Sequence, residues 1–211
     1  MEIKKLQNQR AKIVLRELKK MFPEARTVLN FSNDWELIVA VALSAQTTDK
    51  QVNVVTSTLF KKYPKLIDYV NANHEEFTQD VSSVNYYKNK AKYILAAAQM
   101  LHNDFNGAVP KTVKELMKLP GVGRKTANVV LGNAHGLVEG IAVDTHVQRL
   151  AQKFGLTENA TPEKIEKDLM EILPRDEWFD FTNRIIDYGR SYSPAHKKDR
   201  TDPICVLLDT M

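Results

Sequence analysis

Two side chains in the middle of the chain combine types and positions that could do chemistry. Lys125 lies in the run from Leu119 to Leu131, just after two glycines, and Asp144 stands directly before Thr145-His146. A free lysine amine is a nucleophile, and a carboxylate can help to activate it or stabilise positive charge that develops during its attack. The pair therefore predicts covalent chemistry in which an amine attacks.

The segment that carries Lys125 predicts two helices joined by a hairpin. Thr112 and Glu115 form a capping box that opens the first helix, and Pro120 stops it. The second helix is expected to begin at about Arg124. Lys125 would then lie in its first turn.

The turn between these helices contains Gly121 and Gly123. Glycine tolerates positive φ and lets backbone N–H groups approach an anion closely, so a phosphate is the expected ligand. Arg124 and Lys125 break a local rule, because each cation at the positive end of a helix costs roughly 0.3–1 kcal/mol. A broken rule of this kind indicates function. The helix dipole and the arginine both disfavour an ammonium ion, which favours the nucleophilic amine of Lys125.

Asp144 has a structural explanation as well as a chemical one. It opens a helix expected over residues 144–154, and aspartate is a favoured N-cap. The two roles are compatible, since a carboxylate held by helix amides is rigidly aimed.

The rest of the chain predicts helices and no convincing strand, which makes the fold class all-α. The spacing of apolar residues, the capping residues and the positions of glycine and proline predict helices over 1–20, 35–43, 49–61, 89–104, 162–173 and 177–188, the last ending at Gly189. No linker or repeat marks a domain boundary.

Composition describes an ordinary globular protein of 211 residues with 43% hydrophobic and 27% charged residues. The longest apolar run, Leu37 to Leu43, is far below the roughly 18 residues of a membrane span, so no membrane association is expected. The single cysteine, Cys205, excludes an internal disulfide and favours a cytoplasmic location. A net charge of +4 gives mild support to a nucleic-acid partner.

Several motifs in order give the chain a resemblance to the endonuclease III branch of the helix-hairpin-helix DNA glycosylases. These motifs are Asn30-Phe31-Ser32, Leu43 to Asp49, the run from Leu119 to Leu131, Ile141 to His146, and Tyr188-Gly189-Arg190. The resemblance implies two helical lobes with a cleft between them. One lobe would be contiguous over residues 24–136, with the hairpin at about 112–132, and the other would combine 1–23 with 137–211. The hairpin and Asp144 would face each other across the cleft.

The resemblance also implies an activity, that of a base-excision-repair DNA glycosylase with abasic-site β-lyase activity that removes oxidised pyrimidines. The expected partner is double-stranded DNA with damaged bases or abasic sites, bound by a monomer associated with the nucleoid. Lys125 would form a Schiff base at C1′ of the flipped sugar, and Asp144 would stabilise the developing charge. The hairpin would hold the flanking phosphates through Gly121, Val122, Gly123, Arg124 and Thr126.

Extruding a base leaves a gap in the duplex that the protein must fill. Gln46 and the Tyr86-Tyr87 pair are the candidates for this role. The family has a glycine-leucine pair where this chain has Asn85-Tyr86. A tyrosine ring can act as a wedge by stacking, and the alternative is that both tyrosines are merely half-buried. His146 is expected either to contact DNA or to serve only the local structure.

A larger departure lies at the C-terminus, where the family usually carries four cysteines that bind a 4Fe-4S cluster. Ser193 and Arg200 stand near two of the expected positions. We predict no cluster and no other metal site, since the histidines are scattered. Residues 190–211 would instead be held by packing of Ile204, Val206, Leu207 and Leu208. A basic group, His196, Lys197, Lys198 and Arg200, would be either a phosphate-contacting surface or a solvated loop.

Two alternatives stay open at this point. A monofunctional glycosylase of another branch, acting on adenine or alkylated bases, would typically lack the lysine that Lys125 supplies. A non-catalytic DNA-binding module would use the hairpin only to hold phosphates. Asp144 argues against that module, because binding DNA requires no carboxylate near a negatively charged backbone.

Overall fold

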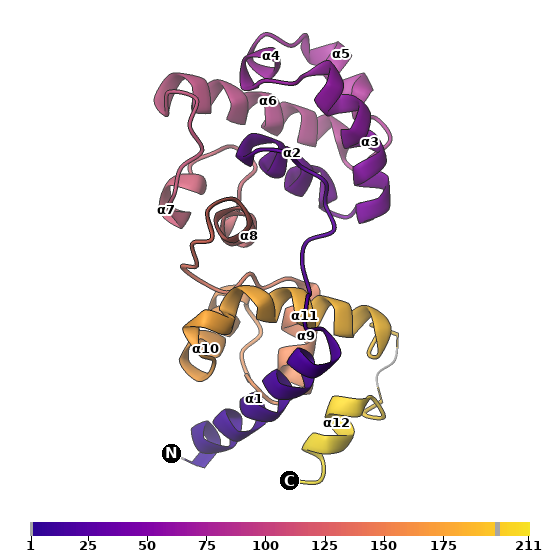
Figure 1. The fold of residues 1–211 in the computed structure, drawn as a ribbon, viewed down its shortest axis with the longest axis vertical. Coiled ribbons are helices and arrows are strands. Elements are labelled where there is room, and N and C mark those ends of the chain that lie inside the picture. The colour runs from indigo at the N-terminus through magenta and orange to yellow at the C-terminus, as the bar shows by residue number, and fades with distance from the viewer. Residues whose placement is uncertain (1, 197–198) are drawn as a thin grey trace. The chain divides into compact units, whose positions relative to one another are not determined.

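The computed structural model describes residues 2–196 and 199–211, and within these ranges the protein is helical and has no strand. The elements are α1 (Glu2–Met21), α2 (Asp34–Ser44), α3 (Asp49–Lys62), α4 (Leu66–Val70), α5 (His74–Asp80), α6 (Tyr87–Asp104), α7 (Val113–Leu116), α8 (Arg124–His135), α9 (Thr145–Lys153), α10 (Pro162–Ile172), the 3₁₀ turn η1 (Arg175–Glu177), α11 (Trp178–Ser191) and α12 (Pro203–Leu208) (Figure 1). The all-α prediction is confirmed. None of the described helices is both long enough and apolar enough to cross a membrane.

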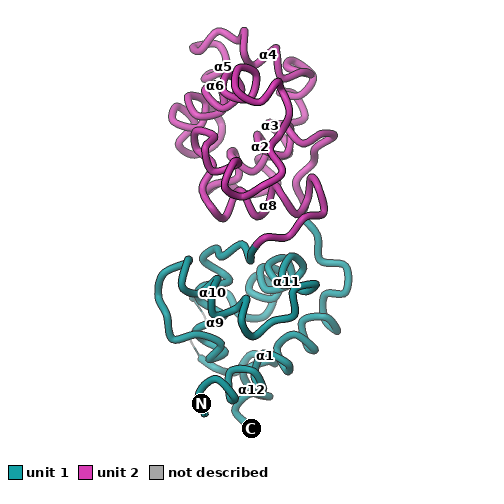
Figure 2. The backbone as a smooth tube through the Cα atoms, turned by 90° about the vertical axis from the view of Figure 1, so that its left-hand side faces the viewer, with its two compact units in different colours: residues 1–27, 140–211 teal, residues 28–139 magenta. Residues whose placement is uncertain are grey.

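The chain forms two compact units (Figure 2). Unit 1 combines Met1–Thr27 with Gly140–Met211, and unit 2 is the contiguous segment Val28–Glu139. Each unit has its own cluster of buried apolar side chains.

Unit 2 is built around α2, a helix of mostly apolar residues that contacts α3, α6 and α8. The helix begins where the side chain of Asn33 accepts a hydrogen bond from the Glu36 N–H at 2.9 Å. The pair Asn33 and Glu36 has the spacing of a capping box, but only half of that box is formed, because the Glu36 carboxylate accepts from the Ser32 N–H, at 2.6 Å. Burial of α2 on several sides fixes the helices around it.

In unit 1, α1 packs against α10, α11 and α12, and α9 packs against α10 and α11. The prediction that a helix stops at Gly189 is wrong, because α11 continues to Ser191. Glycine at position 189 is explained by close packing and not by helix capping. A Cβ at this position would lie 2.6 Å from Nδ1 of His146 on α9, closer than real contacts allow.

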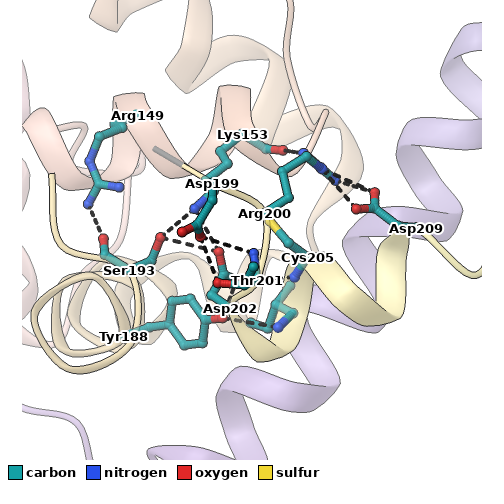
Figure 3. A network of polar contacts seen from close by, with 11 residues as sticks. Arg149, Lys153, Tyr188, Ser193, Asp199, Arg200, Thr201, Asp202, Cys205 and Asp209 are labelled. Atoms are coloured by element: carbon teal, nitrogen blue, oxygen red, sulfur yellow. Dashed lines mark hydrogen bonds and ion pairs between the residues drawn. The ribbon is translucent and has the colours of Figure 1, made fainter. Parts of the chain in front are cut away.

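The C-terminal segment of unit 1 is held by a buried polar network centred on Asp202 (Figure 3). Its carboxylate pairs with Nζ of Lys153 at 2.7 Å and accepts from the Tyr188 hydroxyl at 2.5 Å. It also caps α12, accepting from the Cys205 N–H at 3.1 Å. Ser193 joins the network by accepting from Lys153 at 2.8 Å.

Electrostatics within this network favour the ionised carboxylate of Asp202. Burial by itself would raise the pKa of Asp202, but hydrogen bonds from Lys153, Tyr188 and Cys205 together hold it at about 2. The sequence-based expectation for this segment is therefore incomplete. Ile204 and Leu208 are buried as expected, whereas Val206 and Leu207 are exposed, and the polar network around Asp202 adds to the apolar contacts.

Asp202→Asn is expected to destabilise the protein by about 3 kcal/mol, because it leaves the Lys153 ammonium buried without a counter-ion. Asp209→Asn is the matched control, since Asp209 forms an exposed pair with Arg200 and its loss should change little. Urea denaturation followed by circular dichroism measures both variants.

The effect of Asp202→Asn should also depend on pH. The pKa of Asp202 is lowered on folding, so its contribution is complete above the ordinary aspartate value of 3.8 and is lost as the pH falls towards 2. The stability gap between wild type and Asp202→Asn should close over that interval. A gap that persists at the lower pH would contradict the ion pair as its source.

Candidate nucleic-acid interface and active-site residues

The predicted hairpin is present at the start of α8 in unit 2. Thr112 caps α7, its Oγ1 accepting from the Glu115 N–H at 3.2 Å, and α8 begins at Arg124. Val122 is buried in the core of unit 2 and fixes the turn. The two-helix prediction is therefore confirmed.

The two glycines of the hairpin serve different purposes. Gly121 has a φ of +79°, and a Cβ there would lie 2.8 Å from the Cβ of Tyr93, so both backbone conformation and space require glycine. Gly123 has a φ of −87°, which any residue adopts, so the expectation of positive φ is wrong for it. A Cβ at Gly123 would meet nothing within 4 Å, which leaves open space beside the helix N-terminus.

This open helix end has the properties of an anion site. Gly123 is the N-cap of α8 and supplies no side-chain cap, and the first turn contains no acidic residue. Arg124 and Lys125 are exposed there, and Thr126 is half-buried. Backbone N–H groups at such an end, together with two cations, attract a phosphate.

Asp144 lies in unit 1 and caps α9, with Oδ1 accepting from the Val147 N–H at 2.9 Å. The predicted N-cap is thus confirmed, and Oδ2 takes no part in that bond. Lys125 belongs to unit 2. The joint chemistry of Lys125 and Asp144 stays a prediction.

His146 lies in the first turn of α9 and contacts α11. Its Nδ1 is buried and has no hydrogen-bond partner among the described residues. Burial lowers the pKa of His146; Asp144 opposes this shift, while Arg149 and Arg190 add to it. The imidazole is therefore neutral near pH 7 and does not attract phosphate as a cation. A DNA contact by His146 stays a prediction.

The structure brings together the two loops predicted to fill the gap in DNA. The side-chain amide of Asn85 donates to the Gln46 carbonyl, and the Asn85 N–H donates to Oγ1 of Thr47 at 3.2 Å. Gln46 and Tyr86 are both exposed, and both have positive φ, 54° and 57°. The sequence did not reveal this shared left-handed conformation, because neither residue is glycine.

The tyrosine pair divides between two environments. Tyr87 packs against the core of unit 2, whereas Tyr86 is 63% exposed. The half-buried alternative therefore fits Tyr87 and not Tyr86. An open hollow of about 310 Å³ lies beside Tyr86, lined also by Tyr87, Lys88 and Asn89.

The residues of this chain do not fit a 4Fe-4S cluster. Such a cluster takes about four thiolates, and the only cysteine, Cys205, is buried with its thiol pKa raised to about 12. Ser193 is engaged with Lys153, and Arg200 pairs with Asp209 at 2.6 Å. In the described part of the chain no three acidic, histidine or cysteine side chains are grouped to hold a metal ion.

The proposed basic surface near the C-terminus is only partly visible. Lys197 and Lys198 lie outside the described residues. His196 is exposed, and Arg200 is held by Asp209. A phosphate contact by this group stays a prediction.

Comparison with known proteins agrees with this geometry. Over residues 39–175 the sequence matches the HhH-GPD superfamily of base excision DNA repair proteins, which sets the class of the protein. An endonuclease III of Synechocystis sp. is 43% identical over 197 residues, covering 93% of this chain and 88% of the relative. The chain belongs to the endonuclease III family, and the protein is a base-excision DNA glycosylase with abasic-site lyase activity.

Two solved structures are similar over nearly the whole chain. A non-covalent endonuclease III–DNA complex has a TM-score of 0.90 at 44% identity and covers 95% of this chain and 94% of its own. A trapped endonuclease III–DNA covalent intermediate has a TM-score of 0.89 at 44% identity and covers 93% of both chains.

The two hairpin glycines provide a matched pair of variants. Gly121→Ala is expected to cost about 1–3 kcal/mol of stability, because its Cβ would clash with Tyr93 at a positive φ. Gly123→Ala should cost less than about 1 kcal/mol, because its Cβ enters open space. It should nevertheless weaken DNA binding, since that space is where a phosphate would approach.

Urea denaturation measures the stability of each variant. Fluorescence anisotropy with a duplex that contains an uncleavable abasic analogue measures its affinity for DNA. Wild-type affinity in Gly123→Ala would exclude close approach of a phosphate at this position.

Proposed function

We propose that Lys125 is the nucleophile of this enzyme and that its substrates are oxidised pyrimidines and abasic sites in double-stranded DNA, bound by a monomer. The observation that carries the proposal is the start of α8, where two exposed cations follow an N-cap glycine that has open space beside it and no side chain with which to cap the helix. A phosphate bound there would hold the damaged strand next to the Lys125 amine.

The proposed reaction begins with extrusion of the damaged nucleotide, because a lesion inside the duplex is out of reach. Gln46 and Tyr86 fill the gap, and their exposure and proximity support this role. The hairpin grips the flanking phosphates through backbone N–H groups, which read no sequence. Lesion choice then depends on the pocket that receives the base.

The chemical steps follow from an amine at C1′. The unprotonated Lys125 amine attacks C1′, the bond to the base breaks, and the base leaves with a proton. Asp144 stabilises positive charge on the sugar during this step. The secondary amine opens the sugar ring to an iminium ion, loss of a C2′ proton expels the 3′ phosphate, and water then releases the lysine.

Substrate preference and location belong to the same proposal. Preference for oxidised pyrimidines is supported by membership of the endonuclease III family. A cytoplasmic location, with the nucleoid, is supported by the single cysteine and the DNA substrate.

Borohydride reduction should trap the wild-type protein on a duplex with one abasic site. Lys125→Gln should form no adduct and still bind the duplex, because only the nucleophile is lost. Asp144→Asn should trap more slowly, by about 10- to 1000-fold. Lys61→Gln, which removes an exposed lysine elsewhere in unit 2, is the control. Adduct formation by Lys125→Gln would remove Lys125 from the mechanism, and tight binding without any wild-type adduct would indicate a monofunctional enzyme or a binding module.

Duplexes that each contain one altered base test the substrate class. Single-turnover excision should be fastest for an oxidised pyrimidine and at least about tenfold slower for an oxidised purine or an alkylated adenine, since shape and polar contacts select the flipped base. Faster release of either purine would overturn the pyrimidine assignment without affecting the role of Lys125.

A further inference from the structure

Lys90, in the first turn of α6, is a buried lysine that the reaction above does not use. The residue is only 7% exposed. Its ammonium donates hydrogen bonds to the carbonyls of Leu43 and Ala45, at 2.8 and 2.6 Å, and to Oγ1 of Thr47, at 3.1 Å. A lysine ammonium has three N–H donors, so each of them has a partner.

The environment of Lys90 is unusual for a cation, because these three partners are neutral oxygens. Burial lowers the pKa of Lys90, which reflects the cost of removing an ammonium ion from water. Part of that cost is offset at the C-terminal end of α2, where the carbonyls carry partial negative charge. An apolar side chain would avoid the cost altogether, so the lysine requires another explanation.

The positions of the three acceptor oxygens, on both sides of Gln46, supply that explanation. Leu43 and Ala45 flank the end of α2, directly before Gln46. Oγ1 of Thr47, on the other side of Gln46, also accepts from the backbone N–H of Asn85. The ammonium therefore fixes the turn around Gln46. Through Thr47 it also fixes Asn85, the residue directly before Tyr86.

Lys90 is tied to the second loop through the backbone as well. Tyr86 is the N-cap of α6, and the Lys90 N–H donates to its carbonyl at 3.1 Å. One residue at the start of α6 thus contacts both loops, the first through its ammonium and the second through its backbone N–H.

The backbone conformations of the two exposed residues, Gln46 and Tyr86, need to be held by surrounding contacts. Gln46 and Tyr86 adopt φ values of 54° and 57°, a region that is strained for residues with a Cβ. Strained residues persist only where the surrounding contacts determine the conformation, and they cluster at functional sites.

We propose that Lys90 is a positioning residue that holds Gln46 and Tyr86 together in the conformation that enters the DNA duplex. This inference rests on the proposed gap-filling role of those two residues. Lys90 touches neither the substrate nor the reacting atoms, and it acts through the two loops.

The test compares two substrates for the same variant. Lys90→Met keeps the unbranched chain as far as the ε-carbon and removes the ammonium with its three hydrogen bonds. Excision of a base lesion from a duplex should slow by about 10- to 100-fold, because the gap-filling residues lose their geometry. Cleavage of an abasic site in single-stranded DNA should stay within about twofold of wild type, since no stacked base has to be displaced. Partial unfolding would lower both rates equally and leave their ratio unchanged.

Two further variants guard against misfolding and simple charge loss. Thr47→Val preserves shape and removes the oxygen shared by Lys90 and Asn85. The ratio of the excision rate on duplex DNA to the cleavage rate on single-stranded DNA should therefore fall as it does in Lys90→Met, by a smaller factor. Lys92→Met removes an exposed lysine from the same helix and should leave the ratio unchanged. An unshifted ratio in both Lys90→Met and Thr47→Val would overturn the inference.

Gln46→Ala and Tyr86→Ala separate this inference from the proposed function. Each variant should lower the same ratio. Adding Lys90→Met to the double variant Gln46→Ala/Tyr86→Ala should lower the ratio little further, because the effects of substitutions in residues that act as a unit do not add. A normal ratio in both alanine variants would refute gap filling itself, and Lys90 would then have nothing to position. A lowered ratio in these variants with a normal ratio in Lys90→Met would refute only the role of Lys90.

Discussion

Burial of α2 is the constraint on which the candidate site in unit 2 depends. The helix presents apolar side chains on nearly every face, so it is stable only when other helices surround it. It contacts α3, α6 and α8. The start of α8 supplies the hairpin, the start of α6 supplies Tyr86, and the end of α2 supplies Gln46. One hydrophobic requirement thus assembles three polar, exposed features that lie far apart in the sequence.

Polar groups then set the fine geometry that the apolar core leaves undetermined. Hydrophobic contact is non-directional, whereas hydrogen bonds fix distances and angles. In unit 2 the Lys90 ammonium defines the turn at the end of α2. In unit 1 the Asp202 carboxylate performs the same task for α12. Each is a buried charge that holds a turn or a helix start: the Lys90 ammonium bonds to residues 43–47, and the Asp202 carboxylate connects the start of α12 to α9 and α11.

The features that could be predicted from the sequence are local ones. The hairpin, the Thr112 cap and the Asp144 cap depend on residues within a few positions of one another, and all three are present. Errors arose where packing overrode a local signal. Gly189 would end an isolated helix, but here it makes room for His146, and α11 runs through it. Local sequence patterns do not reveal the roles of Lys90 and Lys153, because their partners are about 40 residues or more away along the chain.

The buried position of Cys205 has a consequence for the chemical stability of the protein. Thiolates, and not thiols, react with oxidants, and a thiol whose pKa is raised to about 12 stays protonated at physiological pH. Cys205 is the chain's only cysteine. Oxidants that damage DNA bases should therefore react slowly with the only cysteine of this enzyme, which repairs such damage.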